Sequence, residues 1–204
     1  MDRAGEILDF WFEGVTDSTV IDRRQSPFHK WFDKNERFDE EIRLNFEGDF
    51  LQAREGGLAV WEKSPEGTLA LILCFDQFTR NMFRNSPQMF SADPLALALS
   101  AHAVKTGLDS QLKLIERLFV YMPFMHAEDR TMQETSVKFF ESLAETCAQS
   151  SPGNAAYYHN TLSFARRHKD IVERFGRFPH RNRILGRSST LDEVEFLAKP
   201  GSAF

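Results

Sequence analysis

Helix-start signals constrain the fold of this chain more than any other feature of its sequence. A Ser or Asp before a proline can cap a helix and place the proline at the first helical position, where its missing N–H costs nothing. Such pairs recur along the chain, at Ser26-Pro27, Ser64-Pro65, Ser86-Pro87, Asp93-Pro94 and Ser151-Pro152. A capping box at Thr190-x-x-Glu193 predicts a further helix near the C-terminus. These signals predict many helices joined by short connections.

Helical periodicity fills the intervals between these signals. Apolar residues recur every three or four positions over 3–12, 36–54, 94–105, 111–122, 129–148 and 153–175. Residues 65–83 are apolar on nearly every side as far as Asp76, which predicts a central, buried helix. The sequence has no Asn-Gly or Asp-Gly turn and no sustained two-residue alternation, so nothing indicates strands. We therefore expect an all-α, antiparallel helical array or bundle of about eight to ten helices, in a single domain over residues 1–204.

Composition narrows the functional classes. The 204 residues carry 25 bases against 30 acids, which disfavours a general nucleic-acid binder. No apolar run approaches the ~18 residues of a membrane span, and the first residues lack the basic start of a signal peptide, so we expect a cytoplasmic protein with no membrane partner. The two cysteines, Cys74 and Cys147, lack metal-ligand spacing. We expect no bound metal and no cofactor, and the sequence leaves the oligomeric state open.

One segment near the C-terminus stands apart in its charge. Residues 168–187 hold six Lys or Arg and two His against two acids, in a chain that is acidic overall. Guanidinium groups bind carboxylates or phosphates through paired hydrogen bonds. Arg177, His180 and Arg181 therefore predict an anionic contact, either with the protein's own carboxylates or with a ligand. The internal partners that would fit are Asp76, Glu128 and Asp129.

A second polar segment follows directly upon the buried helix. Spacing of four residues places Asp76 beside Arg80, and Gln77 beside Asn81, on a helical face. This face either lies where the helix becomes exposed to solvent, with a weak ion pair between Asp76 and Arg80, or forms a polar patch at the entrance of a pocket. The candidate ligand-binding residues are Asp76, Gln77, Arg80, Asn81, Arg177 and Arg181.

The third polar segment, residues 121–129, reads YMPFMHAED. Pro123 is expected to break or kink the helix before it. His126 and Glu128 follow, and together they could form an acid–base pair. Alternatively, Glu128 or Asp129 caps the next helix and His126 is an ordinary interior or surface histidine. The candidate catalytic residues are His126, Glu128 and His180.

These segments resemble a family known as domain of unknown function 924. The resemblance rests on FWF near the start, LALILCFDQFTRNMFR, YMPFMHAED, and HKDIVERFGRFPHRNRILGRSST followed by LDEVEFL. It implies a tetratricopeptide-like array of antiparallel helix pairs, but no activity, because the family has none assigned. Thr79 stands where the resemblance leads us to expect proline, and its presence predicts the loss of a kink.

Three functions stay open from the sequence. The one we favour is a binding module for an anionic small molecule or a peptide end, held in a pocket of Arg, His and Asp side chains. An enzyme would instead use His126 or His180 as acid and base, oriented by Glu128 or Asp76, for hydrolysis or proton transfer. The third alternative is a purely structural clasp. All three require the basic segment to fold back against the middle helices.

Overall fold

The computed structural model describes residues 2–202, and within that range its regular elements are all helical. The nine α-helices are α1 (Arg3–Phe12), α2 (Glu36–Arg54), α3 (Pro65–Ile72), α4 (Thr79–Met82), α5 (Asp93–Thr106), α6 (Leu114–His126), α7 (Arg130–Ser150), α8 (Ala155–Phe175) and α9 (Leu191–Leu197), all within residues 2–202. The all-α prediction and the expected number of helices are confirmed. No helix in this range is long and apolar enough to cross a membrane.

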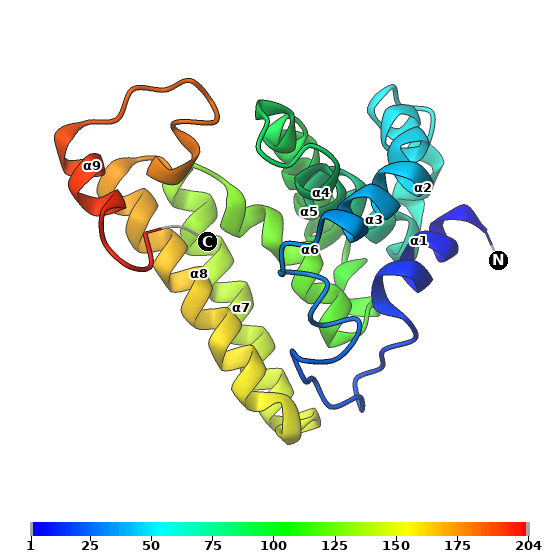
Figure 1. Ribbon diagram of the computed structural model, residues 1–204. Coiled ribbons are helices and arrows are strands. Elements are labelled where there is room, and N and C mark those ends of the chain that lie inside the picture. Colours follow the sequence, from blue (N-terminus) through cyan, green and yellow to red (C-terminus); the bar gives the residue numbers. More distant parts are fainter. Residues whose placement is uncertain (1, 203–204) are drawn as a thin grey trace.

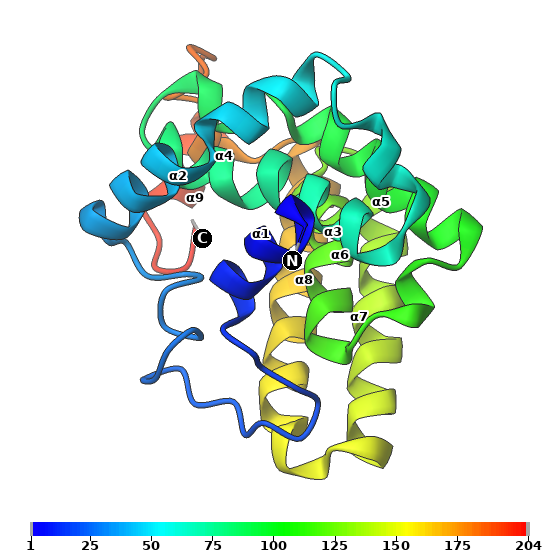
Figure 2. The same ribbon diagram turned by 90° about the vertical axis from the view of Figure 1, so that its right-hand side faces the viewer.

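The helices form two groups (Figure 1). Helices α1–α6 pack together on one side, and α7 and α8 lie side by side as a long antiparallel pair on the other. Helix α6 joins the groups because it packs against both α5 and α7. The loop between α1 and α2 reaches the turn between α7 and α8 (Figure 2), where the Asn154 side chain hydrogen-bonds to the backbone of Thr19 and Ile21 at 2.9 Å.

Aromatic side chains fill the centre of the first group. Trp11 stacks on Trp31 and meets the edges of Phe78 and Phe119, with ring centroids 5.5–6.3 Å apart. All four side chains are buried. Large rings bury much apolar area, and edge-to-face contacts add about 1 kcal/mol each. The abundant phenylalanines thus join helices that are distant in the sequence into one core.

The predicted buried helix over 65–83 is interrupted in its middle. Helix α3 begins at Pro65, with Ser64 as its N-cap, and a π-helical turn over Leu73–Phe78 separates it from α4. Every residue from Gly67 to Thr79 is buried. The turn accommodates one extra residue in the helix, and such turns are frequent at functional sites. It carries Asp76, a carboxylate within an apolar interior.

At the position where the resemblance predicts proline, the Thr79 hydroxyl donates a hydrogen bond of 2.8 Å to the carbonyl of Phe75. The chain therefore keeps an irregular helix here without a proline. Threonine hydroxyls that bond back to the preceding turn often bend helices.

Of the predicted break or kink at Pro123, the break does not occur, because α6 continues through Pro123 and ends at His126; the kink stays a prediction. Proline removes only one helical hydrogen bond, at a cost of about 3 kcal/mol. Both sides of this helix are buried from Leu114 to Met125 almost without interruption, and that burial outweighs the local cost.

Two of the predicted helix starts also differ from the structure. Ser26-Pro27 lies in a region of turns and begins no helix. Asp93 is the first residue of α5 rather than its cap, and Ala92 occupies the N-cap position. The Asp93 carboxylate is therefore available for contacts elsewhere.

Candidate functional site

The basic segment, residues 168–187, folds back against the ends of α5 and α6. Arg181 Nη1 lies 3.2 Å from Asp93 Oδ2 at the start of α5. Arg181 Nη2 donates a hydrogen bond of 3.0 Å to the carbonyl of His126 at the end of α6. The arrangement that all three functional hypotheses require is present.

Five side chains meet at this point and form what we call the inner cluster: Asp76, Arg80, Asp93, His126 and Arg181. His126 Nδ1 lies 2.7 Å from Asp76 Oδ1. Arg80 Nη1 lies 3.2 Å from the same oxygen and 3.1 Å from Asp93 Oδ1. Asp93 thus bridges the two arginines, and Asp76 joins Arg80 to His126.

The protonation states in the inner cluster follow from burial and pairing. Burial alone would raise the pKa of Asp76, but the Arg80 charge and the hydrogen bonds from His126 and Gln77 hold it well below its usual range. Burial lowers the pKa of His126, and Asp76 only partly offsets this. At neutral pH we assign an ionised Asp76 and a neutral His126 with its proton on Nδ1. His126 Nε2 then carries a lone pair, and it has no hydrogen bond to any residue from 2 to 202.

Two further imidazoles lie close to His126. The ring of His168 is 6.3 Å from that of His126, and Phe178 lies between His168 and His180, 5.4 and 5.6 Å from them. Burial lowers the pKa of His168 well below its usual value and that of His180 to about 4. All three imidazoles are therefore neutral at pH 7. No group of three His, Cys, Asp or Glu side chains within residues 2–202 is arranged to hold a metal ion.

Arg181 is fixed between two aromatic rings. Its guanidinium lies 4.5 Å from the ring of Phe90 and 4.6 Å from that of Phe178. Burial lowers its pKa to about 10, so it stays charged at neutral pH. Arg181 Nε and Arg80 Nη2 are buried, yet neither donates a hydrogen bond within residues 2–202. Buried donors are nearly always satisfied, and these two are the unsatisfied buried donors of the inner cluster within residues 2–202.

A second set of contacts lies beside the inner cluster, and we call it the outer clasp: Glu128, Arg177, Asn182, Arg187 and Glu193. Arg187 donates to both carboxylate oxygens of Glu128 at 2.5 and 2.8 Å. Arg177 donates to both oxygens of Glu193 at 2.7 and 2.8 Å, and Asn182 joins Glu193 at 3.2 Å. Two buried atoms of the clasp, Arg187 Nε and Asn182 Oδ1, lack a partner within residues 2–202.

Glu128 therefore does not orient His126. It accepts hydrogen bonds from the Phe178 backbone N–H at 2.8 Å and from Arg187. Burial would raise the pKa of Glu128, but these hydrogen bonds lower it below its ordinary value. Asp129 caps α7, since its carboxylate accepts from the Met132 N–H at 2.9 Å. Arg177 likewise belongs to the clasp and does not touch the inner cluster.

Gln77 and Asn81 do not share a face as the spacing predicted. Gln77 Nε2 lies 2.6 Å from Asp76 Oδ2 and so supports the inner cluster. Asn81 instead donates to Asp39 on α2 at 2.8 Å, beside Arg84, which contacts the same carboxylate. Gln77 lies in the π-helical turn and Asn81 in α4, and each contacts a different carboxylate, whereas Asp76 and Arg80 span the same boundary and pair as their spacing predicted.

Asp93 and Phe90 complete the site, and the sequence predicted neither. Asp93 precedes a proline, and that local pattern already had an explanation as a helix cap. Its role depends on two arginines from other parts of the chain, which no local pattern reveals.

Comparison with known proteins gives a family but no activity. The family described as "Bacterial protein of unknown function (DUF924)" matches residues 7–201. The solved structure of a protein of unknown function from Agrobacterium tumefaciens is 37% identical, covers 96% of each chain and has a TM-score of 0.76. No curated protein matches the chain. The fold and the family thus agree, and function must be argued from the site.

Proposed function

Given that this chain belongs to the DUF924 family of bacterial proteins, we propose that the inner cluster is a general-base site in which His126 removes a proton from water or from a substrate. The observation that carries the proposal is the contact of 2.7 Å between His126 Nδ1 and the buried Asp76 carboxylate. A neutral imidazole with one nitrogen held by a carboxylate and the other open is equipped to accept a proton near neutral pH.

Each neighbour of His126 has a distinct role in this proposal. Asp76 fixes the tautomer and stabilises the imidazolium that forms when Nε2 accepts a proton. Gln77 and Arg80 hold Asp76 in place through its two oxygens. Asp76 also makes His126 a better candidate than His180, because the carboxylate orients His126 directly.

The arginines supply the binding part of the site. Arg80 Nη2 and Arg181 Nε have N–H groups unused by residues 2–202. Because both nitrogens are buried, a carboxylate or phosphate of the substrate would reach them only after neighbouring side chains shift. The reaction class is hydrolysis or proton transfer. In the first the base removes a proton from water, and in the second it removes a proton from the substrate.

A binding module without chemistry is the second candidate, and the same unused N–H groups favour it. An anionic small molecule or a peptide end would then be the ligand. Against it, Arg80 and Arg181 already face Asp76 and Asp93, so the inner cluster has no excess positive charge.

The cytoplasmic location expected from the sequence remains a prediction.

The test is a screen of p-nitrophenyl esters and phosphates, with solvent-deuterium exchange at the acidic C–H of small keto acids as the proton-transfer assay. His126→Gln should lower any activity found by about 10²–10⁴-fold, the usual contribution of a general base. Asp76→Asn should lower kcat as well, because it can no longer stabilise the imidazolium. His159→Gln, at an exposed histidine of α8, is the matched control and should change nothing.

Two outcomes would separate the candidates. If His126→Gln keeps full activity, the general-base proposal is wrong. If phosphate or acetate raises the melting temperature of the wild type but not of Arg80→Gln, and the screen finds no activity that His126→Gln lowers, the site binds anions without chemistry.

A further inference from the structure

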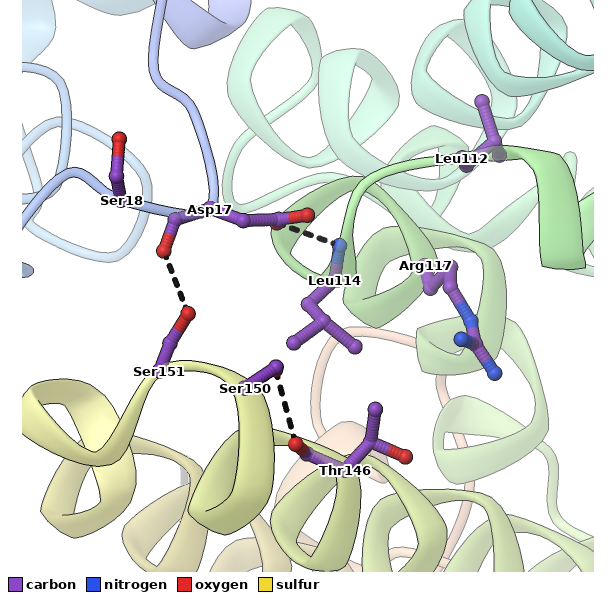
Figure 3. Close-up of a pocket in the computed structure, with 8 residues that line it drawn as sticks. All are labelled: Asp17, Ser18, Leu112, Leu114, Arg117, Thr146, Ser150 and Ser151. Atoms are coloured by element: carbon purple, nitrogen blue, oxygen red, sulfur yellow. Dashed lines mark hydrogen bonds between the residues drawn. The ribbon is translucent and has the colours of Figure 1, made fainter.

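A separate cavity of about 460 Å³ lies between the loop that follows α1, the start of α6 and the end of α7 (Figure 3). It shares no residue with the inner cluster or the outer clasp. Its volume falls within the range of small-molecule sites, roughly 300–1,000 Å³. Its two charged lining residues are Asp17 and Arg117.

Asp17 keeps part of its hydrogen-bonding capacity. Its Oδ1 accepts from the Leu114 N–H at 2.8 Å and so caps α6, while its backbone carbonyl accepts from the Ser151 hydroxyl at 2.8 Å. These contacts fix the carboxylate at the cavity wall. The other carboxylate oxygen, Oδ2, has no hydrogen bond within residues 2–202. The exposed carboxylate of Asp17 is therefore held in place through one oxygen, and its other oxygen bonds none of the described residues.

Arg117 makes no direct ion pair within residues 2–202. Its guanidinium reaches only the Tyr121 hydroxyl, at 3.2 and 3.4 Å, and no carboxylate within residues 2–202 lies at ion-pair distance from it. Tyr121 in turn donates to Asp109 at 2.6 Å. Burial and this carboxylate raise the pKa of Tyr121 to about 12, so the phenol is neutral and links Arg117 to Asp109 through its hydroxyl without a direct ion pair.

The two opposite charges do not pair with each other. Figure 3 shows the Asp17 carboxylate turned towards the backbone N–H of Leu114, and the Arg117 guanidinium on the other side of Leu114 and directed away from that carboxylate. Fixed opposite charges separated by an apolar surface are complementary to a dipolar molecule. We propose that this cavity binds a small zwitterion of the amino-acid class, with its ammonium group at Asp17 and its carboxylate at Arg117.

The experiment is a titration of isotope-labelled protein followed by ¹H–¹⁵N spectra. The probes are glycine, 4-aminobutanoate and 6-aminohexanoate, which differ in the spacing of their charges, and the singly charged butanoate and butylamine. The amides of Ser18, Thr146 and Ser151, at the cavity wall, should shift saturably. The best zwitterion should bind at least about tenfold more tightly than either singly charged probe, a difference of about 1.4 kcal/mol.

Two variants, each of which removes one charge, test the two binding groups separately. Asp17→Asn keeps an oxygen that can cap α6, and Arg117→Gln keeps a donor on a shorter stem. Each should reduce the affinity for the zwitterion about tenfold, to the level of a singly charged probe. His126→Gln should leave it unchanged, so this proposal and the general-base proposal fail independently.

Three results would overturn the proposal. In the first, no zwitterion shifts the cavity amides. In the second, butanoate binds as tightly as the best zwitterion, or either variant binds like the wild type. In the third, the shifts gather around Arg80 and Arg181 instead, which would assign the ligand to the inner cluster.

Discussion

The inner cluster and the outer clasp use the same residue types to join the same basic segment to the middle helices, yet their geometry differs. In the clasp, Arg187 and Arg177 each face a carboxylate with two nitrogens, at 2.5–2.8 Å. In the inner cluster, Arg80 and Arg181 each reach carboxylates through a single nitrogen, at 3.1–3.2 Å. Paired short contacts hold two elements rigidly together. Single, longer contacts constrain the paired groups less, while each region keeps at least one buried arginine N–H without a partner within residues 2–202.

This difference in geometry distinguishes a structural ion-pair network, the outer clasp, from a candidate acid–base site, the inner cluster. The clasp joins α9, the basic segment and the start of α7, and its carboxylates are fully engaged by arginine. The inner cluster holds neutral imidazoles beside charged groups in a buried setting, which is the environment that tunes acid–base groups. Three experiments can break or sharpen this distinction.

The largest effect is expected for Glu128→Gln. This change removes two charge-assisted hydrogen bonds and leaves Arg187 half-buried without a carboxylate. Removing the charge of one partner should lower the free energy of unfolding by about 2 kcal/mol. This loss is smaller than the loss expected for a fully buried ion pair. Urea denaturation measures it. A loss below about 0.5 kcal/mol would mean that the contact behaves as an ordinary surface ion pair.

A smaller loss of stability is expected for Asp93→Asn, about 1 kcal/mol, because Arg80 keeps Asp76 as a partner and Arg181 keeps its aromatic rings and the His126 carbonyl. The inner cluster would then carry excess positive charge. Phosphate should raise the melting temperature of this variant more than that of the wild type. Equal phosphate responses would show that the charge balance of the cluster does not control anion binding.

The effect that is smallest at neutral pH is on the dependence of stability on pH. The pKa of His180 is lowered to about 4 by burial, against about 6.5 in an unfolded chain. Between these two pKa values, His180 is protonated in the unfolded chain but neutral in the folded protein. The free energy of unfolding therefore falls as the pH drops from about 6.5 towards 4. His180→Gln should reduce that slope by about 1 kcal/mol per pH unit. Denaturation curves at several pH values test this, and an unchanged slope would contradict the burial of this imidazole.

The clasp should respond in a lower pH range. The pKa of Glu128 is held below its ordinary value by Arg187 and the Phe178 N–H despite burial. Its stabilising contribution is therefore complete above about pH 4.5 and is lost as the pH falls through the folded value.

Most helices could be predicted from the sequence because their signals are local. Ser64-Pro65 and the Thr190 capping box begin helices as expected, since a cap depends on residues within one turn. The break at Pro123 does not occur because burial outweighs the local cost of the proline, and Asn81 contacts Asp39 of α2, which local spacing does not encode. The choice of Asp76 over Glu128 as the partner of His126 depends on how α6 packs against the buried helix, which no spacing within one segment encodes.

The π-helical turn over Leu73–Phe78 also sets how far this architecture tolerates changes in length. Removing one residue there would convert it to regular α-helix and rotate the following side chains by about 100° relative to α3. At present α3 packs against α1 and α5 while α4 packs against α2, and the turn reconciles the two registers. A homologue lacking that residue could keep one packing register or the other, but not both together with a carboxylate facing α6.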